Sequence, residues 1–177
     1  MRTLELERTI EEANTIIDFG CGPFGLPLAN QQWKKELTAV DPLLDEYAAT
    51  IPFFNKKDYP ETHFVTKSIE DFSSSITYNI VFCMNAINHV HAIDKAFDVV
   101  VNSAQQNSTI VVSIDAHNFS FFKFLFRLIP GDILHPHQYN LKEYSSFLKR
   151  RNCVIEKMVC IKKEFFFDHY VLVARKL

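Results

Sequence analysis

A glycine-rich turn near the N-terminus constrains the fold more than any other feature of this sequence. Gly20, Gly22 and Gly25 form a GxGxxG pattern that directly follows the apolar run 15–19. Glycine lets the backbone adopt left-handed conformations and approach a ligand closely, and a helix that begins at such a turn presents unpaired N–H groups. The pattern therefore predicts a strand, a tight turn and a helix that together cradle a nucleotide-like ligand.

Two acidic residues near this turn narrow the choice of ligand. Asp41 follows the apolar run 36–40, and a carboxylate about 20 residues after such a turn can accept hydrogen bonds from both hydroxyls of a ribose. Asp18 precedes the turn and would repel the pyrophosphate of a nicotinamide dinucleotide. The same carboxylate would attract the ammonium and sulfonium groups of S-adenosylmethionine, which we therefore expect as the cofactor. A purely structural role for Asp18, as a charge near a helix N-terminus, is the alternative.

Apolar runs and helical patterns alternate along the rest of the chain, and this alternation is typical of a doubly wound parallel sheet. Strands are predicted over residues 15–19, 36–40, 63–67, 79–84 and 109–114. Crossover helices are predicted over residues 24–35, 42–50 and 92–105. Helices over 120–129 and 141–151 then precede an antiparallel strand pair, predicted over 153–161 and 165–174, at one edge of the sheet.

Length and composition agree with a single α/β domain over residues 1–177. The 177 residues are 47% hydrophobic, which is enough for a buried core. Within this domain we expect a short N-terminal segment, 1–14, and a helical insertion over about 118–151 on the side of the methyl acceptor.

Charge and targeting signals exclude several classes of protein. The formal net charge is −2 and no basic stripe is present, so we expect no nucleic-acid partner. The chain begins MRTLELERTI, without the apolar core of a signal peptide, and no apolar run approaches the roughly 18 residues of a membrane span. We therefore expect a cytoplasmic protein without a transmembrane segment.

Cys153 and Cys160 lie on one predicted strand, and their odd spacing predicts that their side chains point to opposite faces of the sheet.

Five stretches of the sequence resemble the successive motifs of one enzyme family. They are "IIDFGCGPFGLPLA", "LTAVDP", "FVTKSIEDF", "YNIVFCMNAINHV" and "NSTIVVSID". In order and spacing they are similar to the motifs of class I S-adenosylmethionine-dependent methyltransferases that act on small molecules or sugars. The resemblance covers residues 15–177. It implies a Rossmann-like, seven-stranded, mostly parallel sheet with an antiparallel last strand, and a cofactor across the carboxyl ends of the first strands.

The resemblance also implies a set of cofactor-binding residues. They are Asp18, Gly20, Cys21, Gly22, Asp41, Pro42, Ser68, Ile69 and Asn85. Asp18 and the glycine-rich turn would flank the methionine part, and Asp41 would bind the ribose hydroxyls. Ser68 stands where the family usually has an aspartate that receives the adenine amino group. A hydroxyl accepts a weaker hydrogen bond than a carboxylate does, unless Glu70 or Asp71 takes over that role.

Five of the seven histidines follow the fourth and fifth predicted strands, or lie in the segment beyond them. Imidazole titrates near neutral pH, so a histidine is a natural general base for a hydroxyl acceptor. The candidate catalytic residues are His89, His117, His135 and His137. The structural alternatives are a brace at a helix start for His89 and loop structure for the others. Asp115 and the last three of these histidines could instead gather around a divalent cation, but their spacing specifies no coordination geometry, and we predict no metal site.

The segment 118–132 is apolar on most of its predicted helical surface. Such a helix needs cover from its own domain, a second copy of the chain, an apolar acceptor or a lipid surface. Few residues precede the first strand, so cover for the cofactor is expected from residues 120–139 or from another chain. The sequence thus favours a homodimer or a larger assembly.

Together these features predict an enzyme that moves a methyl group from S-adenosylmethionine to a hydroxyl of a small metabolite or sugar. Two alternatives of a different class stay open. One is a catalytically silent module with this fold that binds the cofactor or a protein partner. The other is an NAD(P)-dependent oxidoreductase that uses the same glycine-rich turn.

Overall fold

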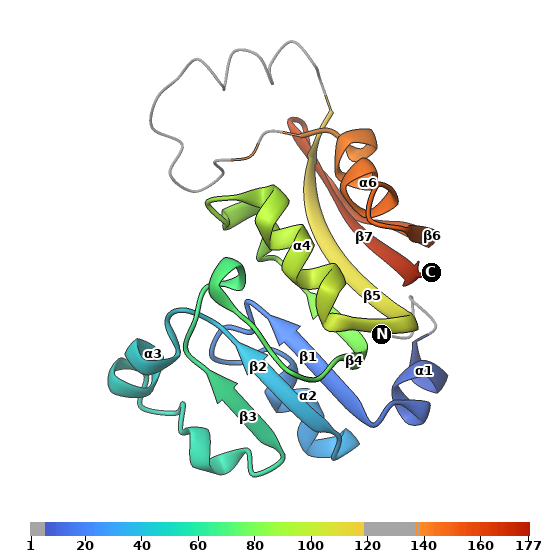
Figure 1. Ribbon diagram of the computed structural model, residues 1–177. Coiled ribbons are helices and arrows are strands. Elements are labelled where there is room, and N and C mark those ends of the chain that lie inside the picture. The colour runs from blue at the N-terminus through green and yellow to red at the C-terminus, as the bar shows by residue number, and fades with distance from the viewer. Residues whose placement is uncertain (1–5, 119–136, 138) are drawn as a thin grey trace.

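The computed structural model describes residues 6–118, 137 and 139–177, which form a seven-stranded sheet with helices on both faces (Figure 1). The strands are β1 (Thr15–Phe19), β2 (Glu36–Val40), β3 (Thr62–Val65), β4 (Tyr78–Cys83), β5 (Ala104–His117), β6 (Cys153–Lys163) and β7 (Phe167–Lys176). Their order in the sheet is β3-β2-β1-β4-β5-β7-β6. Strands β1 to β5 pair in parallel, and β7 is antiparallel to both β5 and β6. The predicted α/β fold with an antiparallel last strand is confirmed.

The described helices are α1 (Glu7–Glu12), α2 (Leu26–Trp33), α3 (Leu44–Thr50), α4 (Ile93–Ser103) and α6 (Leu141–Lys149), with the short 3-10 helices η2 (Lys56–Asp58), η3 (Ile69–Asp71) and η4 (Ile87–His89). Among them, α2, α3, α4 and α6 match predicted ones with small shifts at their ends, whereas α1 and the 3-10 helices were not predicted. Helix α6 begins where the sequence supplies a capping box, because the Asn140 side chain accepts from the Glu143 N–H at 2.9 Å and the Glu143 carboxylate accepts from the Asn140 N–H at 2.8 Å. The helix predicted over 120–129 lies outside the described residues. None of the described helices combines the length and the apolar surface needed to cross a membrane.

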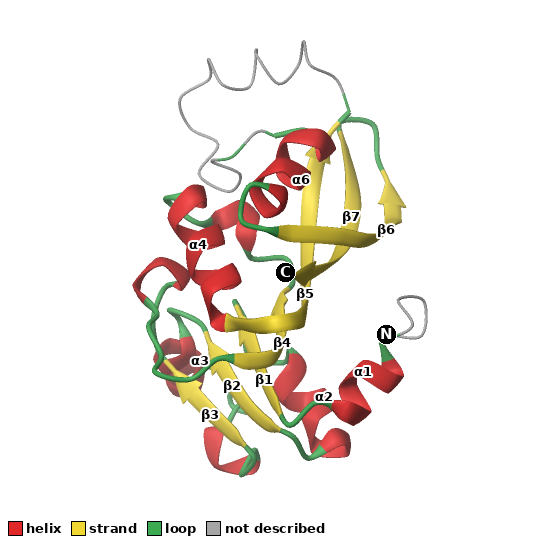
Figure 2. Cartoon of the chain, turned by 45° about the vertical axis from the view of Figure 1, so that its right-hand side comes forward, coloured by secondary structure: helices red, strands yellow, loops and turns green. Residues whose placement is uncertain are grey.

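Helices lie on both faces of the sheet (Figure 2), and buried apolar side chains form a core layer on each face. On one face α4 and α6 pack together through the stacked rings of Phe97 and Phe147, whose centroids lie 4.9 Å apart. On the other face α1 and α2 cover the sheet, and Leu6 and Ile10 are almost fully buried there. The sequence pattern did not indicate α1. This helix lies beside the start of β1 and therefore at the end of the sheet away from the glycine-rich turn.

A change of register in β6 corrects one expectation about its side chains. Cys153 pairs with Lys176 of β7, and Cys160 pairs with Tyr170. Paired residues point to the same face of the sheet, and Lys176 and Tyr170 lie an even number of residues apart on β7, so both cysteines point to one face. The register shifts between Ile155 and Lys157, which places an extra residue in β6. Because one extra residue reverses the alternation, the two cysteines lie on the same face, and the predicted opposite orientation is wrong.

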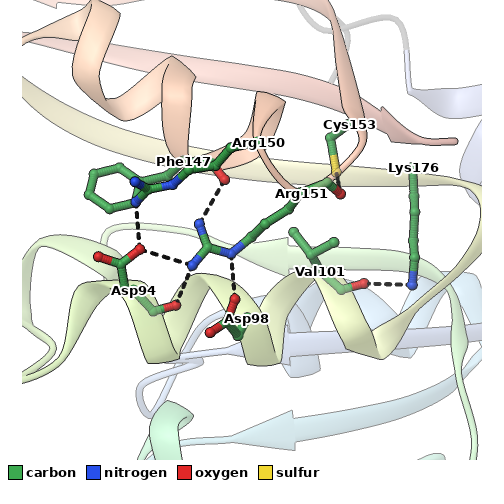
Figure 3. Close-up of polar contacts among 8 residues, drawn as sticks. All are labelled: Asp94, Asp98, Val101, Phe147, Arg150, Arg151, Cys153 and Lys176. Atoms are coloured by element: carbon green, nitrogen blue, oxygen red, sulfur yellow. Dashed lines mark hydrogen bonds and ion pairs between the residues drawn. The ribbon is translucent and has the colours of Figure 1, made fainter.

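A polar network joins α4 to α6 and to the end of β7 (Figure 3). The Arg151 guanidinium donates to the Asp98 carboxylate at 2.6 Å and to the Phe147 carbonyl at 2.9 Å. It also donates to the carbonyl of Asp94, at 2.8 Å, and to its carboxylate. At the other end of α4, Lys176 Nζ donates to the carbonyl of Val101 at 3.0 Å. The network holds both ends of α4 in place, and the segment before α4 forms part of the site described next.

Candidate functional site

A cavity of about 430 Å³ lies at the carboxyl ends of the parallel strands. It is lined by Gly20, Asp41, Pro42, Leu43, Tyr47, Ser68, Ile69, Glu70, Asn85, Ala86, His89, Val90 and His91. These residues follow β1, β2, β3 and β4 in the chain. From β1 the strand order runs outward through β2 and β3 on one side and through β4 and β5 on the other. In an open parallel sheet, ligands bind at the carboxyl ends of the strands where the order changes direction in this way. The cavity is therefore the candidate site, and it includes most of the predicted cofactor-binding residues.

The turn after β1 has the strained backbone that its glycines predict. Gly20 has φ +69° and Gly22 has φ +57°. The Gly20 N–H donates to the Val40 carbonyl at 2.7 Å, which ties the turn to the end of β2. A Cβ at position 20 would lie 2.2 Å from the Cβ of Ala86, a residue of the cavity wall. Position 20 therefore requires glycine for both conformation and space.

Asp41 is buried at the end of β2 and holds the turn from the other side. One carboxylate oxygen accepts from the Gly22 N–H at 3.0 Å, and the other accepts from the Leu43 N–H at 2.9 Å. Each carboxylate oxygen can accept a further hydrogen bond, so both remain able to receive hydroxyl groups. The acid is thus fixed in orientation toward the cavity that it lines.

Asp18 lies outside the cavity wall, beneath the same turn. Its side chain is almost fully buried, and one carboxylate oxygen accepts from the Leu26 N–H, at the start of α2, at 3.3 Å. Burial raises the pKa of Asp18 to about 7. A Cβ at Gly25 would lie 3.3 Å from this carboxylate. Cys21 is buried beside it, and burial raises the pKa of its thiol, which makes it an inert neutral group.

The stretch after β3 holds two acidic side chains with separate partners. The Ser68 hydroxyl donates to the Asp71 carboxylate at 2.8 Å. Glu70 accepts from the backbone N–H groups of His91, at 2.8 Å, and Ala92, at 3.1 Å, and so caps the start of α4. Glu70 lines the cavity, whereas Asp71 does not.

The predicted histidines are divided between the cavity and its surroundings. His89 lines the cavity together with His91. His137 lies next to the wall, with Nε2 at 2.6 Å from the Val90 carbonyl, and burial lowers the pKa of its imidazole. His117 is buried at the end of β5, with its ring centroid 4.2 Å from that of Phe167. His135 lies outside the described residues.

Asp115 has a partner that the sequence reasoning missed. Its carboxylate forms an ion pair with His169 Nδ1, because the two residues lie opposite each other in the pairing of β5 with β7. No local signal links them, since they are far apart in the chain. Among the described residues, no three His, Cys, Asp or Glu side chains form a group that could hold a metal ion.

Several wall residues also escaped the sequence reasoning. They are Leu43, Tyr47, Ala86 and Val90. Leu43 and Tyr47 follow Asp41 closely, so the strand-end position of that acid was the available signal. Ala86 and Val90 were missed because they flank η4, a short 3-10 helix with no apolar period of its own.

Comparison with known proteins supports the methyltransferase resemblance. No family model matches. The chain is 28% identical over 137 residues to the ubiquinone biosynthesis O-methyltransferase of Rickettsia typhi, covering 76% of this chain and 54% of that protein. The protein of the same name from Rickettsia prowazekii is also 28% identical over 137 residues, covering 76% of this chain and 52% of that protein. The chain thus spans about half the length of the curated relatives it matches.

Solved structures share the fold at low sequence identity. A putative methyltransferase from Bacillus halodurans superposes with a TM-score of 0.77 at 13% identity, covering 98% of this chain and 99% of that one. The N-methyltransferase NodS from Bradyrhizobium japonicum, in complex with S-adenosylhomocysteine, has a TM-score of 0.70 at 12% identity and covers 99% of this chain and 85% of that one. The chain therefore has the Rossmann-like fold of S-adenosylmethionine-dependent methyltransferases.

Proposed function

We propose that this chain, which has the fold of class I S-adenosylmethionine-dependent methyltransferases, binds S-adenosylmethionine in the cavity and transfers its methyl group to a hydroxyl of a small molecule. The arrangement of Asp41 carries the proposal. Its carboxylate lines the cavity and is bonded to the Gly22 N–H of the turn after β1. A nucleoside bound there would have its ribose hydroxyls on Asp41, its base toward Ser68 and its amino-acid tail toward Gly20.

The residues of the cavity fit the parts of this cofactor. Leu43 and Ile69 supply apolar surface for the base on the side of Asp41 and Ser68. Gly20 packs without a side chain against Ala86, and both residues line the cavity, so the backbone of the turn is exposed to the methionine part there. Asp18, buried beneath the turn, would be favoured in its ionised form by the ammonium group of the cofactor.

When bound, S-adenosylmethionine supplies an electrophilic methyl group on its sulfonium, and the acceptor oxygen must lose its proton as the new bond forms. His89 and His137 are the candidate bases at this end of the cavity, with His117 at the end of β5. Burial lowers the pKa of His137, so its imidazole is neutral near pH 7. Its Nε2 needs a hydrogen to bond the Val90 carbonyl, which leaves Nδ1 as the basic nitrogen.

A hydroxyl acceptor is supported by the relatives named O-methyltransferases. The acceptor class that we propose from the sequence is a small metabolite or sugar. The proposed setting is the cytoplasm. The sequence prediction that the apolar residues 120–129 are covered by their own domain, by an acceptor or by a second copy falls on a segment outside the described residues. It stays a prediction, as does the single-domain organisation over 1–177.

Calorimetric titration of the purified chain with S-adenosylhomocysteine, with NADH as the control ligand, tests the cofactor directly. We expect micromolar binding of S-adenosylhomocysteine and none of NADH. Binding of NADH alone would overturn the proposal in favour of an oxidoreductase. Binding of S-adenosylhomocysteine with no methyl transfer to any of a panel of phenolic, sugar and small-metabolite hydroxyls would favour the catalytically silent module.

A further inference from the structure

Ser68 and Asp71 form a hydrogen bond that links the cavity wall to the protein surface. Ser68 lines the cavity, whereas Asp71 lies behind it with an exposed side chain. The Ser68 Oγ and an Asp71 carboxylate oxygen are 2.8 Å apart. Lys95 Nζ lies 3.5 Å from the other oxygen of Asp71.

The hydrogen of the Ser68 hydroxyl is committed to this contact. The Ser68 hydroxyl and Lys95 hold the pKa of Asp71 below its usual range, so its carboxylate is ionised near neutral pH. An ionised carboxylate can only accept hydrogen bonds, and Ser68 must therefore be the donor. The Ser68 hydroxyl can therefore only accept a hydrogen bond from a group bound in the cavity.

We propose that Asp71, acting through Ser68, sets the base selectivity of the cavity for a purine with an amino group at position 6. Such a base presents an N–H donor to the Ser68 lone pairs. A purine with an oxygen at position 6 presents an acceptor, and two acceptors facing each other leave both without a hydrogen. The inference rests on the proposed function, because that proposal places the cofactor base beside Ser68. Asp71 is a positioning residue, since it acts on the ligand only through Ser68.

A serine alone would not give the same selectivity. A serine without a carboxylate partner could rotate its hydroxyl to donate to a 6-oxo group or to accept from a 6-amino group. The Glu70 carboxylate lines the same cavity and accepts from the His91 and Ala92 N–H groups through one oxygen. Its other oxygen is also an acceptor, so the Asp71→Ala variant is needed to separate a selectivity set by Ser68 from one set by Glu70. The contact between Ser68 and Asp71 therefore fixes the Ser68 oxygen as a hydrogen-bond acceptor toward the cavity.

The test compares S-adenosylhomocysteine with S-inosylhomocysteine, which differs in carrying oxygen in place of the 6-amino group, by calorimetry on the full chain. The wild type should bind the adenosine form about tenfold more tightly. Ser68→Ala should lose most of this preference by weakening the adenosine form. Asp71→Ala should also lose it, but by binding the inosine form more tightly than the wild type does, because the freed hydroxyl can donate to the 6-oxo group.

The gain of affinity in Asp71→Ala is the readout that a merely structural role would not produce. Asp45→Ala is the matched control, because Asp45 is an exposed carboxylate paired with Lys56 at 2.6 Å and lies outside the cavity wall. It should keep the wild-type preference. Equal binding of both ligands by the wild type, or an unchanged preference in Asp71→Ala, would overturn the inference and leave the cofactor assignment standing. Binding of neither ligand by the wild type would overturn the proposed function itself.

Discussion

The carboxylate of Asp41 accepts a hydrogen bond from the backbone N–H of Gly22 at 3.0 Å. This contact joins the end of β2 to the turn after β1, so the acid and the turn form one unit. The second oxygen of Asp41 accepts from the Leu43 N–H at 2.9 Å, which fixes the plane of the carboxylate. Loss of Asp41 should therefore affect both ligand contacts and the shape of the turn.

Replacement of Asp41 by alanine should abolish micromolar binding of S-adenosylhomocysteine in calorimetry. Asp41→Asn should weaken binding by roughly tenfold to a hundredfold, because an amide keeps one acceptor oxygen but gains a donor group that opposes the Gly22 or Leu43 N–H. Wild-type affinity in Asp41→Ala would contradict the ribose role of this residue. Thermal unfolding of both variants would separate a loss of ligand contacts from a loss of fold.

Gly20→Ala should be far more damaging than Gly22→Ala. Both positions have positive φ, which costs alanine about 1–2 kcal/mol. At Gly20 the added Cβ would also lie 2.2 Å from the Cβ of Ala86, whereas at Gly22 it meets nothing within 4 Å. We expect Gly20→Ala to lower the free energy of unfolding by about 2–4 kcal/mol and to weaken cofactor binding. Urea unfolding of the two variants measures this difference, and equal destabilisation would argue against the close packing at position 20.

Asp18→Asn should stabilise the protein more at pH 8 than at pH 5. The raised pKa of Asp18, about 7, means that the folded protein holds a proton that the unfolded chain releases near pH 4. The stability contributed by the neutral carboxyl is fully present below about pH 4 and is lost as the pH rises through about 7. An asparagine cannot ionise, so it avoids this loss. The advantage of the variant should grow by roughly 1–3 kcal/mol between the two pH values.

Urea unfolding of the wild type and Asp18→Asn across this pH range, without ligand, provides the measurement. Asp45→Asn is the control, because its carboxylate is exposed and the ion pair with Lys56 lowers its pKa. That variant should gain nothing at high pH. A difference between wild type and Asp18→Asn that stays constant with pH would show that Asp18 is already ionised in the folded protein.

Arg151→Met should destabilise the protein by about 2–3 kcal/mol, whereas Arg150→Met should cost less than about 1 kcal/mol. The Arg151 side chain is only 12% exposed and donates to Asp98, Asp94 and the Phe147 carbonyl (Figure 3). The Arg150 side chain is 51% exposed and contacts Asp94. Removal of Arg151 takes away a nearly buried side chain and all its contacts with α4 and with the Phe147 carbonyl, while removal of Arg150 disturbs a solvated pair. Comparable losses in urea unfolding would contradict this distinction.

Alanine at His89, His117, His135 or His137 identifies the base, if a hydroxyl acceptor is found by screening for S-adenosylhomocysteine formation. The variant that removes the base should lower turnover by about 10²-fold to 10⁴-fold and leave S-adenosylhomocysteine affinity nearly unchanged. We expect the largest effect at His137 or His89, which lie at the cavity. Loss of cofactor binding in these variants would argue for a structural role, and undiminished turnover in all four would exclude these four histidines as the base.

Short-range patterns predicted the half of the sheet that contains the cavity. The bounds of β1 and β2 agree with the predicted runs 15–19 and 36–40, because each is a short apolar strand followed by a residue with a distinct role, Gly20 or Asp41. The contact between Asp41 and Gly22 follows from the same elements, since the ends of neighbouring parallel strands meet at one edge of the sheet.

The edge of the sheet formed by β5, β7 and β6 was decided by tertiary structure. Strand β5 extends over Ala104–His117, beyond the predicted 109–114. At its start Ala104 pairs with Tyr78 of β4, and at its end β7 continues to pair with it as far as Phe167. The same pairing brings Asp115 to His169.

Sequence alone therefore determined the fold class, the glycine-rich turn and the acid that lines the cavity at the end of β2, because local period and turn chemistry specify these features. Only the tertiary structure decided the faces of β6, the partner of Asp115 and the orientation of the Ser68 hydroxyl toward Asp71. These depend on strand register and on the geometry of one side chain against another. A period in the sequence does not encode either, because register changes with a single extra residue and a hydroxyl rotates to suit its neighbour.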